Sequence, residues 1–407
     1  MSIFGSVFRV STFGESHGLA VGCVCDGVPS GFEFGLDDVQ PLLNRRRPGQ
    51  SSLTTSRTES DTVEILSGTE FGKTLGTPVA MIVRNLDMRK IDYEETAKVP
   101  RPGHADYTYE LKYGIRASSG GGRSSARETI GRVCAGALAM KYLRDRYGIK
   151  FVSFVDSVMD IKIPENILDS LIANPPNPQE VDSQSVLQTS QDCYSDYHGN
   201  QYSLLDGSPL NERVESETVS QIVTRCPHAP TSARMAARIS QIRSEKDSCG
   251  GTVVGVISNL PIGLGEPVFD KFHAELAKAI ISIPAVKGFE IGSGFQGSEC
   301  MRGSQHNDAF QSHPDSTERL TSTTNHAGGV LGGITNGQNV YFRVAFKPVS
   351  SIGIPQETVD FNGQKITLEL GGRHDPCVLP RAVPIVEAMA AITVMDFVLR
   401  QKTRQFQ

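Results

Sequence analysis

A helical segment near the end of the chain constrains the fold most strongly. Residues 384–400 carry apolar side chains on most sides of a helix, which predicts a buried helix. A helix of this kind needs a sizeable hydrophobic core around it. A chain of 407 residues, 38% of them hydrophobic and 21% charged, can supply that core in one large domain or in two to three ordinary ones.

Apolar runs that alternate with helical patterns predict a mixed fold of the α/β or α+β class. Strands are expected at 20–25, 78–83, 150–155, 252–257 and 340–346. Further helices are expected at 36–47 and 268–282. The sequence contains no internal repeat, so a solenoid or propeller is not indicated.

A run of glycine, serine and arginine from Ser118 to Arg127 is the strongest functional feature. Glycines allow backbone N–H groups to converge, serines add donors, and arginines add charge, so the run predicts an anion site. The alternative is a flexible loop. An apolar pattern from Ala126 to Tyr142, ended by Gly148, predicts a helix that anchors the run. No lysine follows the glycines as in a Walker P-loop, which removes the main support for a kinase or ATPase.

Four other segments combine glycine with arginine, histidine, serine or aspartate. They are Gly14–Gly18, Arg45–Gly49, Arg101–Asp106 and Gly371–Pro376. Taken alone, His17 could be structural, and the three arginines that end the helix at 36–47 could form a solvated cluster. Together the segments provide groups that bind a multiply charged anion and move protons around it.

Charge and cysteine patterns exclude several classes of protein. Residues 156–224 hold 12 acidic and 2 basic residues and are rich in Pro, Asn, Ser and Gln, which predicts an exposed insertion with little chemistry. The rest of the chain has a net charge of +5 without a basic run, which suits a small anionic ligand and argues against nucleic acid. The eight cysteines have no metal-binding spacing and are interpreted as reduced thiols of a cytoplasmic protein. No membrane span or targeting segment is expected.

Residues 292–297 match the GxGxxG pattern of dinucleotide-binding proteins. Polar residues 298–308 follow, where that fingerprint requires a helix. We therefore interpret the match as coincidental.

The chain resembles the chorismate synthase family from about Phe8 to Gln401, interrupted by the acidic segment. Three long motifs carry the resemblance: Gly14–Pro29, Gly120–Gly131 and Gly372–Met389. Supporting blocks lie at Gly263–Asp270, Pro284–Gly292 and Asn325–Gly333. The resemblance implies an α+β fold, a single-domain β-α-β sandwich over residues 1–407 with the insertion at about 156–224, assembled as a homotetramer.

The same resemblance implies a function. Members of the family convert 5-enolpyruvylshikimate 3-phosphate to chorismate by a 1,4-elimination of phosphate, which requires reduced FMN. NADPH enters as reductant in members that reduce their own flavin.

Residue roles follow from the resemblance by position. His17 would protonate the leaving phosphate, His104 would protonate the flavin, and Asp375 would act in removing the ring proton. Ser16 and Ser125 resemble the relay serines. Substrate contacts are expected from Arg46, Arg101, Arg127 and Arg373. Flavin contacts are expected from Arg123, Ser124, Ser125, Ala285, Gly332, Lys347, Pro348, Val349, Ser350, Ser351 and Arg373.

Two positions depart from many bacterial members of the family: Ser52 stands where an arginine is common, and Pro284 where an asparagine is common. Two alternatives remain open from sequence. One is a phosphometabolite-binding protein without turnover, which would need the arginines but not His17, His104 and Asp375 together. The other is a phosphatase or lyase that acts on a sugar phosphate without flavin.

Overall fold

The structure, a computed structural model, describes most of the chain. The described residues are 2–50, 53–55, 59–86, 99–117, 120–183, 186–188, 193–195, 200–203, 209–213, 221–222, 224–313, 316–371 and 374–404. Ser52 and Arg373, both singled out above, lie outside these ranges.

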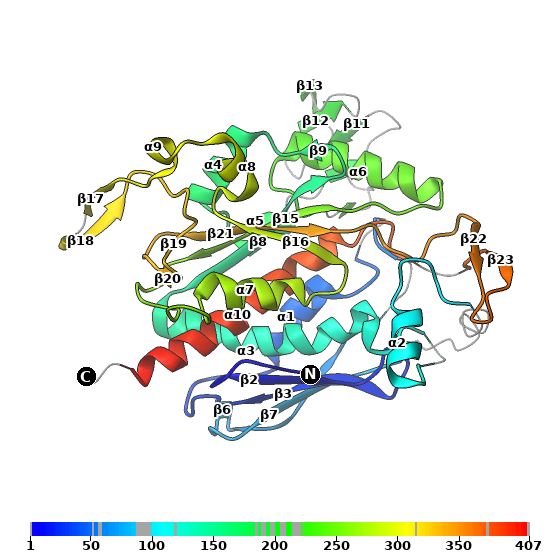
Figure 1. Cartoon of the computed structure of the whole chain (residues 1–407), viewed down its shortest axis with the longest axis horizontal. Helices are drawn as coiled ribbons and strands as arrows, with labels where there is room; N and C mark the ends of the chain where they lie inside the picture. The colour runs from blue at the N-terminus through cyan, green and yellow to red at the C-terminus, as the bar shows by residue number, and fades with distance from the viewer. Residues whose placement is uncertain are drawn as a thin grey trace.

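Two antiparallel sheets form the outer layers of the molecule (Figure 1). The first sheet has the order β1-β2-β3-β7-β4 and consists of Ile3–Phe4, Arg9–Phe13, Ala20–Asp26, Val79–Arg84 and Val63–Ser67. The second has the order β16-β21-β15-β8-β9 and consists of Val286–Ile291, Val340–Phe346, Gly251–Ser258, Lys150–Val158 and Ile161–Lys162. All five predicted strands are therefore confirmed with small changes at their ends.

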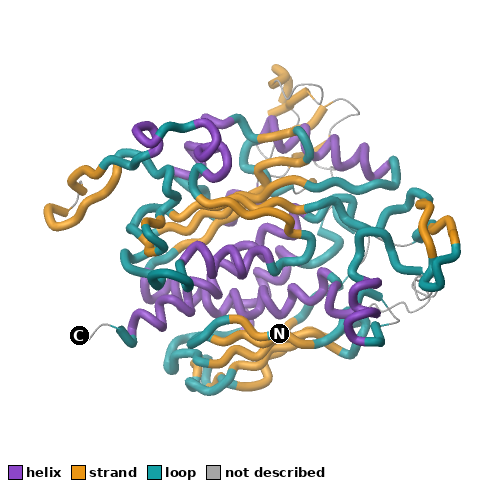
Figure 2. The backbone as a smooth tube through the Cα atoms, viewed as in Figure 1, coloured by secondary structure: helices purple, strands orange, loops and turns teal. Residues whose placement is uncertain are grey.

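Helices fill the space between the two sheets, as Figure 2 shows. They are α1 (Leu36–Arg46), α3 (Thr129–Tyr147), α7 (Phe272–Ile281) and α10 (Leu379–Lys402). One cluster of buried apolar side chains joins both sheets to these helices. The arrangement of sheet, helices and sheet confirms the predicted β-α-β sandwich.

Helix α10 occupies the middle of the sandwich and is buried from Leu379 to Leu399. It is long and apolar enough to cross a membrane, but its apolar window is entirely buried inside the fold, as expected for a core helix. The helix begins at Leu379, five residues before the predicted start, and it continues through Pro384. Proline cannot donate to the carbonyl four residues back; here the guanidinium of Arg225 donates to that carbonyl, on Pro380.

The predicted helix at 268–282 begins only at Phe272. Val268 has a φ of +72°, which no right-handed helix can contain. The amide of Glu266 instead donates to the carbonyl of Asp270 at 3.1 Å, closing a turn ahead of α7.

Smaller elements decorate the sandwich. The remaining helices are α2 (Asp106–Tyr113), α4 (Glu165–Ala173), α5 (Pro178–Ser183), α6 (Ala229–Ser244), α8 (Gly294–Cys300) and α9 (Gly303–His306). Two-stranded hairpins are formed by β5 and β6 (Thr69–Glu70, Lys73–Thr74), β17 and β18 (Phe310–His313, Ser316–Ser322), β19 and β20 (Val330–Leu331, Ile334–Thr335), and β22 and β23 (Gln356–Val359, Lys365–Leu368).

The acidic segment is less separate from the fold than its composition predicts. Strand β8 runs through position 156 to Val158, and Val158, Ile161 and Ile163 are buried in the core, so the boundary at 156 is wrong. Beyond α4 and α5 the chain forms an antiparallel sheet of five short strands, β10 to β14: Val186–Gln188, Cys193–Ser195, Asn200–Ser203, Pro209–Arg213 and Gln221–Ile222.

The GxGxxG match at 292–297 does not form a dinucleotide fold, but the reason differs from the one expected from sequence. A helix does follow it, because α8 begins at Gly294 inside the motif, so the expected absence of a helix is wrong. The preceding strand β16 nevertheless pairs antiparallel with β21, whereas a dinucleotide fold needs parallel strands joined by a crossover helix.

Helices α3 and α10 approach closely at Gly136. A Cβ atom added there would lie 2.3 Å from the Cβ and 2.5 Å from the Cα of Ala388. We therefore expect Gly136→Ala to lower the free energy of unfolding by about 1–3 kcal/mol, although alanine is the better helix former by about 1 kcal/mol. Urea denaturation measures the change.

The matched control is Gly303→Ala in α9, where an added Cβ would meet no atom within 4 Å. This variant is expected to be neutral or slightly stabilised. Equal stability of the two variants would show that the helices do not pack as closely as described.

Candidate active site

A cavity of about 1480 Å³ opens where loops from both sheets meet the start of α10. Most of the predicted catalytic and ligand-binding residues line its wall. They are His17, Arg101, His104, Arg123, Ser124, Ser125, Ala285, Lys347, Pro348, Val349, Ser350, Ser351 and Asp375. Pro284, one of the two departures from the family pattern, also lies on the wall. The fold thus brings together residues from segments up to 358 positions apart.

The loop between β2 and β3 presents His17 to the cavity. Gly14 has a φ of +90°, and a Cβ there would lie 2.1 Å from the carbonyl oxygen of Ala20, so the turn requires glycine. The Ser16 hydroxyl lies 3.0 Å from Nδ1 of His17, and the Ser16 amide donates to the Gly122 carbonyl at 3.3 Å. Ser16 is 1% exposed and lies behind His17. It therefore orients the ring and ties it to the glycine run.

The glycine run is a compact loop that leads into α3. It contains two 3₁₀ turns, Gly122–Ser124 and Ala126–Glu128, so α3 begins three residues later than predicted. Ser125 separates the turns, and its hydroxyl accepts a hydrogen bond from the Arg127 amide at 3.3 Å. The helix ends where predicted, with Gly148 in the left-handed conformation. The expected anchoring of the run is confirmed.

Gly120 leaves room for the His17 ring. Its φ is +106°, and an added Cβ would lie 2.5 Å from Nδ1 of His17. We expect Gly120→Ala to displace the ring, to strain the backbone by about 1–3 kcal/mol, and to lower turnover more than stability. Steady-state kinetics measures turnover, and the midpoint of urea unfolding measures stability, so the two measurements together separate these effects. The control is Gly363→Ala, where φ is also positive at +80° but an added Cβ meets nothing within 4 Å; equal loss of turnover in both variants would contradict the role of Gly120.

Two cations on the wall have no carboxylate partner among the described residues. The Arg123 guanidinium donates to backbone oxygens of Thr12 and Gly14 at 3.1 and 3.2 Å and to the Thr12 hydroxyl at 2.6 Å. The Lys347 ammonium donates to the Gly103 carbonyl at 2.6 Å and to the Ser350 hydroxyl at 2.5 Å. Partial burial and the nearby Lys287 lower the pKa of Lys347. Uncompensated positive charge of this kind attracts an anionic ligand.

The loop before α2 carries Arg101 and His104. Both face Asp106, the first residue of α2: Nε of Arg101 donates to its carboxylate at 2.7 Å, and Nδ1 of His104 lies 2.8 Å from it. Burial alone would raise the pKa of Asp106, but the hydrogen bonds from Arg101 and His104 outweigh it and hold the pKa well below its usual range. Arg101 therefore lines the cavity, but Asp106 already compensates much of its positive charge.

Asp375 also lines the cavity and is held from two sides. The Thr55 amide donates to Oδ1 at 2.9 Å, and the guanidinium of Arg381, from the first turn of α10, bonds Oδ2. The neighbouring His374 also lines the cavity, and burial together with Arg101 lowers its pKa. His104, His374 and Asp375 therefore line the same space as His17.

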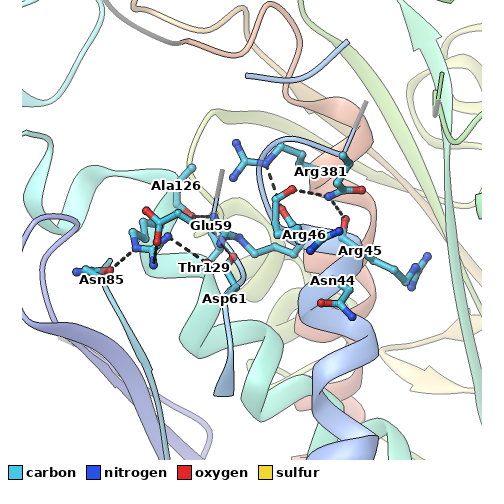
Figure 3. Close-up of polar contacts among 12 residues, drawn as sticks. Asn44, Arg45, Arg46, Glu59, Asp61, Asn85, Ala126, Thr129 and Arg381 are labelled. Carbon is cyan, nitrogen blue, oxygen red and sulfur yellow. Dashed lines mark hydrogen bonds and ion pairs between the residues drawn. The ribbon is translucent and has the colours of Figure 1, made fainter. Parts of the chain in front are cut away.

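Arg46 and Arg127 are not among the residues that line the cavity, and their expected contacts with substrate stay predictions. Their side chains are 2% and 4% exposed, and both bond Asp61, at 2.8 and 3.2 Å respectively (Figure 3). Arg127 also pairs with Glu59 at 2.7 Å. Burial lowers the pKa of Arg46 to about 10. The buried carboxylates attract both guanidinium groups into a layer beneath the glycine run, where they support the wall.

Gly332 also lies away from the cavity wall. It occupies the turn between β19 and β20 with a φ of +61°, which explains why glycine is needed there. The next residue, Gly333, packs against the side chain of Lys271. Figure 1 shows this hairpin at the opposite side of the molecule from α2.

Several residues of the site were missed from sequence. Asp106 and His374 lie inside segments that the sequence identifies, but no role was predicted for either residue. Asp61 and Arg381 gave no local signal, because their partners are 15 to 66 residues away or lie across a turn. Among the described residues, no group of three His, Cys, Asp or Glu side chains is arranged to hold a metal ion.

Comparison with known proteins agrees with this geometry. The family model for chorismate synthase matches residues 8–399. The chorismate synthase of Schizosaccharomyces pombe is 52% identical over 404 residues, covering 99% of this chain and 97% of that protein. The chorismate synthase of Opitutus terrae is 48% identical, covering 98% and 97%. A crystal structure of chorismate synthase superposes with a TM-score of 0.69 at 28% identity, covering 98% of this chain and 93% of that one.

Proposed function

The chain belongs to the chorismate synthase family, and on this premise we propose how the cavity performs the reaction. The enzyme is a lyase of the shikimate pathway that serves aromatic amino acid biosynthesis. Its substrate is 5-enolpyruvylshikimate 3-phosphate, and the reaction eliminates phosphate across four ring atoms to give chorismate. It is in this sense a carbon–oxygen lyase acting on phosphates.

The observation that carries the proposal is the joint occurrence of cations and proton carriers around one space. Arg123 and Lys347 supply positive charge without a carboxylate partner among the described residues, while His17, His104 and Asp375 face the same cavity. A protein that only binds a phosphometabolite needs the cations but has no use for three proton carriers. The substrate has one phosphate and two carboxylates, for which Arg46, Arg101, Arg127 and Arg373 remain the proposed contacts.

His17 is the proposed proton donor to the leaving phosphate. Phosphate leaves more easily when its bridging oxygen is protonated, and a positioned histidine lowers such a barrier. When the ring is protonated, Nδ1–H can donate to the Ser16 hydroxyl 3.0 Å away, which leaves Nε2–H for the substrate. Ser16 thereby orients the acid without touching the substrate.

Asp375 is the proposed acceptor of the ring proton. Its carboxylate is oriented by Arg381 and by the Thr55 amide, so its position in the wall is fixed before a ligand arrives. Such preorganisation keeps a proton acceptor aligned with the C–H bond whose proton it removes. Ser125, on the same wall, remains the proposed relay residue beside it.

The cavity also suits a flavin mononucleotide. Arg123, Lys347 and the hydroxyls of Ser124, Ser350 and Ser351 on its wall are donors for a phosphate and for the polar edge of the ring system. Ala285, Pro348 and Val349 would add contacts with the ring faces. When bound in its reduced form, FMN supplies the electron density that eases cleavage of the carbon–oxygen bond.

Turnover under reducing conditions tests the function. The protein is incubated anaerobically with the enolpyruvyl substrate, FMN and dithionite, and chorismate and inorganic phosphate are quantified. We expect both products in equal amounts. Phosphate release without chorismate would identify a phosphatase instead, and the absence of both products would favour a non-catalytic binding protein.

A second incubation determines the source of electrons. The same mixture is assayed aerobically with NADPH in place of dithionite. Turnover in both incubations means that the chain reduces FMN itself with NADPH, and turnover with dithionite alone means that it needs a separate reductase.

Three further proposals concern the whole chain. We propose that residues 1–407 act as one domain, because a single core cluster joins both sheets. Exposed apolar side chains such as Phe71 and Phe269 support assembly into a homotetramer, which light scattering of the purified protein would measure. A cytoplasmic location is proposed from the cysteine pattern and would be checked by fractionation.

A further inference from the structure

We propose that Asp106 is a positioning residue that fixes the tautomer and the orientation of His104, so that Nδ1 carries a proton and Nε2 is presented to the cavity. The inference rests on the proposed function only for its catalytic consequence. The tautomer itself is a property of the protein without ligands.

The geometry around Asp106 is closely defined. Its carboxylate is 4% exposed and accepts hydrogen bonds from Nε and Nη2 of Arg101 at 2.7 and 2.9 Å and from the Arg101 amide at 3.2 Å. Oδ1 also lies 2.8 Å from Nδ1 of His104. Arg101 thus holds the carboxylate, and the carboxylate faces the imidazole.

Two groups compete for Nδ1 of His104. Nη2 of Arg101 lies 3.0 Å from Nδ1 and can only donate, whereas Oδ1 of Asp106 lies 2.8 Å away and, as a carboxylate, can only accept. An unprotonated Nδ1 would direct its lone pair at that carboxylate. Nη2 already has a partner in Oδ1 of Asp106 at 2.9 Å. The shorter contact to a charged acceptor therefore favours a proton on Nδ1.

The opposite edge of the ring faces the glycine run. A Cβ added at Gly121 would lie 3.3 Å from Cε1 and 3.4 Å from Nε2 of His104, so this edge lies against the loop that forms the cavity wall. With Nδ1 turned to Asp106, Nε2 is the nitrogen available to a ligand. The neutral ring accepts a proton there and the charged ring returns it.

The charge of Asp106 strengthens its contact with Nδ1 of His104. The carboxylate stays ionised throughout the working range because hydrogen bonds from Arg101 and His104 outweigh the effect of burial and lower its pKa. An ionised carboxylate can only accept a hydrogen bond, so it requires a proton on the nitrogen that faces it. The nearby cations are Arg101 and Arg116, whose Nη1 lies 4.0 Å from Oδ1 of Asp106, and neither can accept a hydrogen bond from Nδ1.

Nitrogen NMR of the ligand-free protein tests the tautomer directly. The protein is labelled with ¹⁵N-histidine, and His104→Gln identifies the signals of His104 among nine histidines. We expect the neutral ring to carry its proton on Nδ1. In Asp106→Asn, which removes the charge at nearly constant shape, we expect the proton to move to Nε2.

Kinetics provides the second readout. For Asp106→Asn we expect kcat to fall by about 10²-fold and KM for the substrate to change much less. Asp106→Glu should recover the wild-type tautomer and part of kcat. The matched control is Glu110→Gln on the same helix, whose side chain pairs with Arg116 at 3.5 Å; it should retain the wild-type tautomer and kcat.

Each outcome decides the proposal. A proton on Nε2 in the wild-type protein, or a tautomer unchanged in Asp106→Asn, would overturn it. Loss of stability in Asp106→Asn with an unchanged tautomer would reduce Asp106 to a structural partner of Arg101. If no chorismate forms under any condition, the proposed function fails, but the NMR result still stands or falls separately.

Discussion

Replacing His17 by glutamine is expected to lower kcat for chorismate formation by about 10²- to 10⁴-fold, the usual contribution of a positioned general acid. Glutamine keeps a similar polar side chain next to Ser16 but cannot deliver a proton to the leaving phosphate. KM for the substrate should change much less than kcat, because the cations that attract it remain. Anaerobic stopped-flow measurement of chorismate formation gives both constants.

A second histidine provides a close control for this experiment. Nε2 of His306 lies 3.0 Å from the Ser293 hydroxyl, a contact like that of His17 with Ser16, but His306 is not on the cavity wall. His306→Gln should leave kcat unchanged. Full turnover of a folded His17→Gln protein would exclude His17 as the proton donor.

The second large effect is expected for stability, from Asp61→Asn. Asp61 is 2% exposed and bonds both Arg46 and Arg127, which are themselves buried. Removing one member of a buried ionic cluster leaves charge without compensation, so the free energy of unfolding should fall by about 3–5 kcal/mol. Asparagine tolerates the φ of +46° at this position, so backbone strain does not add to the loss.

An exposed ion pair in the same sheet region gives the comparison. Asp26 pairs with Arg9 at the surface, where the two side chains are 41% and 56% exposed. Asp26→Asn should cost less than about 1 kcal/mol. Urea unfolding at equal protein concentrations measures both variants, since assembly makes stability depend on concentration. Similar losses in the two variants would contradict the buried cluster.

The parts of the fold that were predictable from sequence are those with a local pattern. The apolar faces of α3 and α10 and the runs of β15 and β21 are visible in any short window of residues. Boundaries failed where the determining contact is distant. Pro384 predicts a helix start, yet α10 continues through it because Arg225, 155 positions before Pro380, bonds the free carbonyl. The turn before α7 depends on a backbone angle at Val268 that its sequence does not reveal.

The candidate site also has residues that a local pattern predicts and residues whose positions depend on distant contacts. Glycine-rich motifs identify the loops around His17, His104 and Asp375 because glycine is required wherever the backbone turns tightly or a ring packs against it. The arginines are less predictable, because the direction of a long charged side chain depends on where carboxylates lie in three dimensions. Arg123 meets only neutral oxygens among the described residues and faces the cavity, while Arg127, four positions later, is drawn to Glu59 and Asp61.

The glycine run therefore lines the cavity, as expected of a loop that binds a ligand. It forms a wall with Arg123, Ser124 and Ser125 on the cavity side and Arg127 on the far side. The expected division of the run, with Arg123, Ser124 and Ser125 toward the flavin and Arg127 toward the substrate, stays a prediction. Arg127 stabilises the run from below, through the same carboxylate that holds Arg46.

The central claim is that one cavity holds substrate and flavin together between His17 and Asp375. A crystal structure of the protein with FMN and the enolpyruvyl substrate tests it most directly. We predict both ligands inside the cavity bounded by Gly120–Ser125, with the substrate phosphate within hydrogen-bonding distance of Nε2 of His17. Either ligand bound outside this cavity, or a substrate phosphate that does not contact His17, would contradict the account.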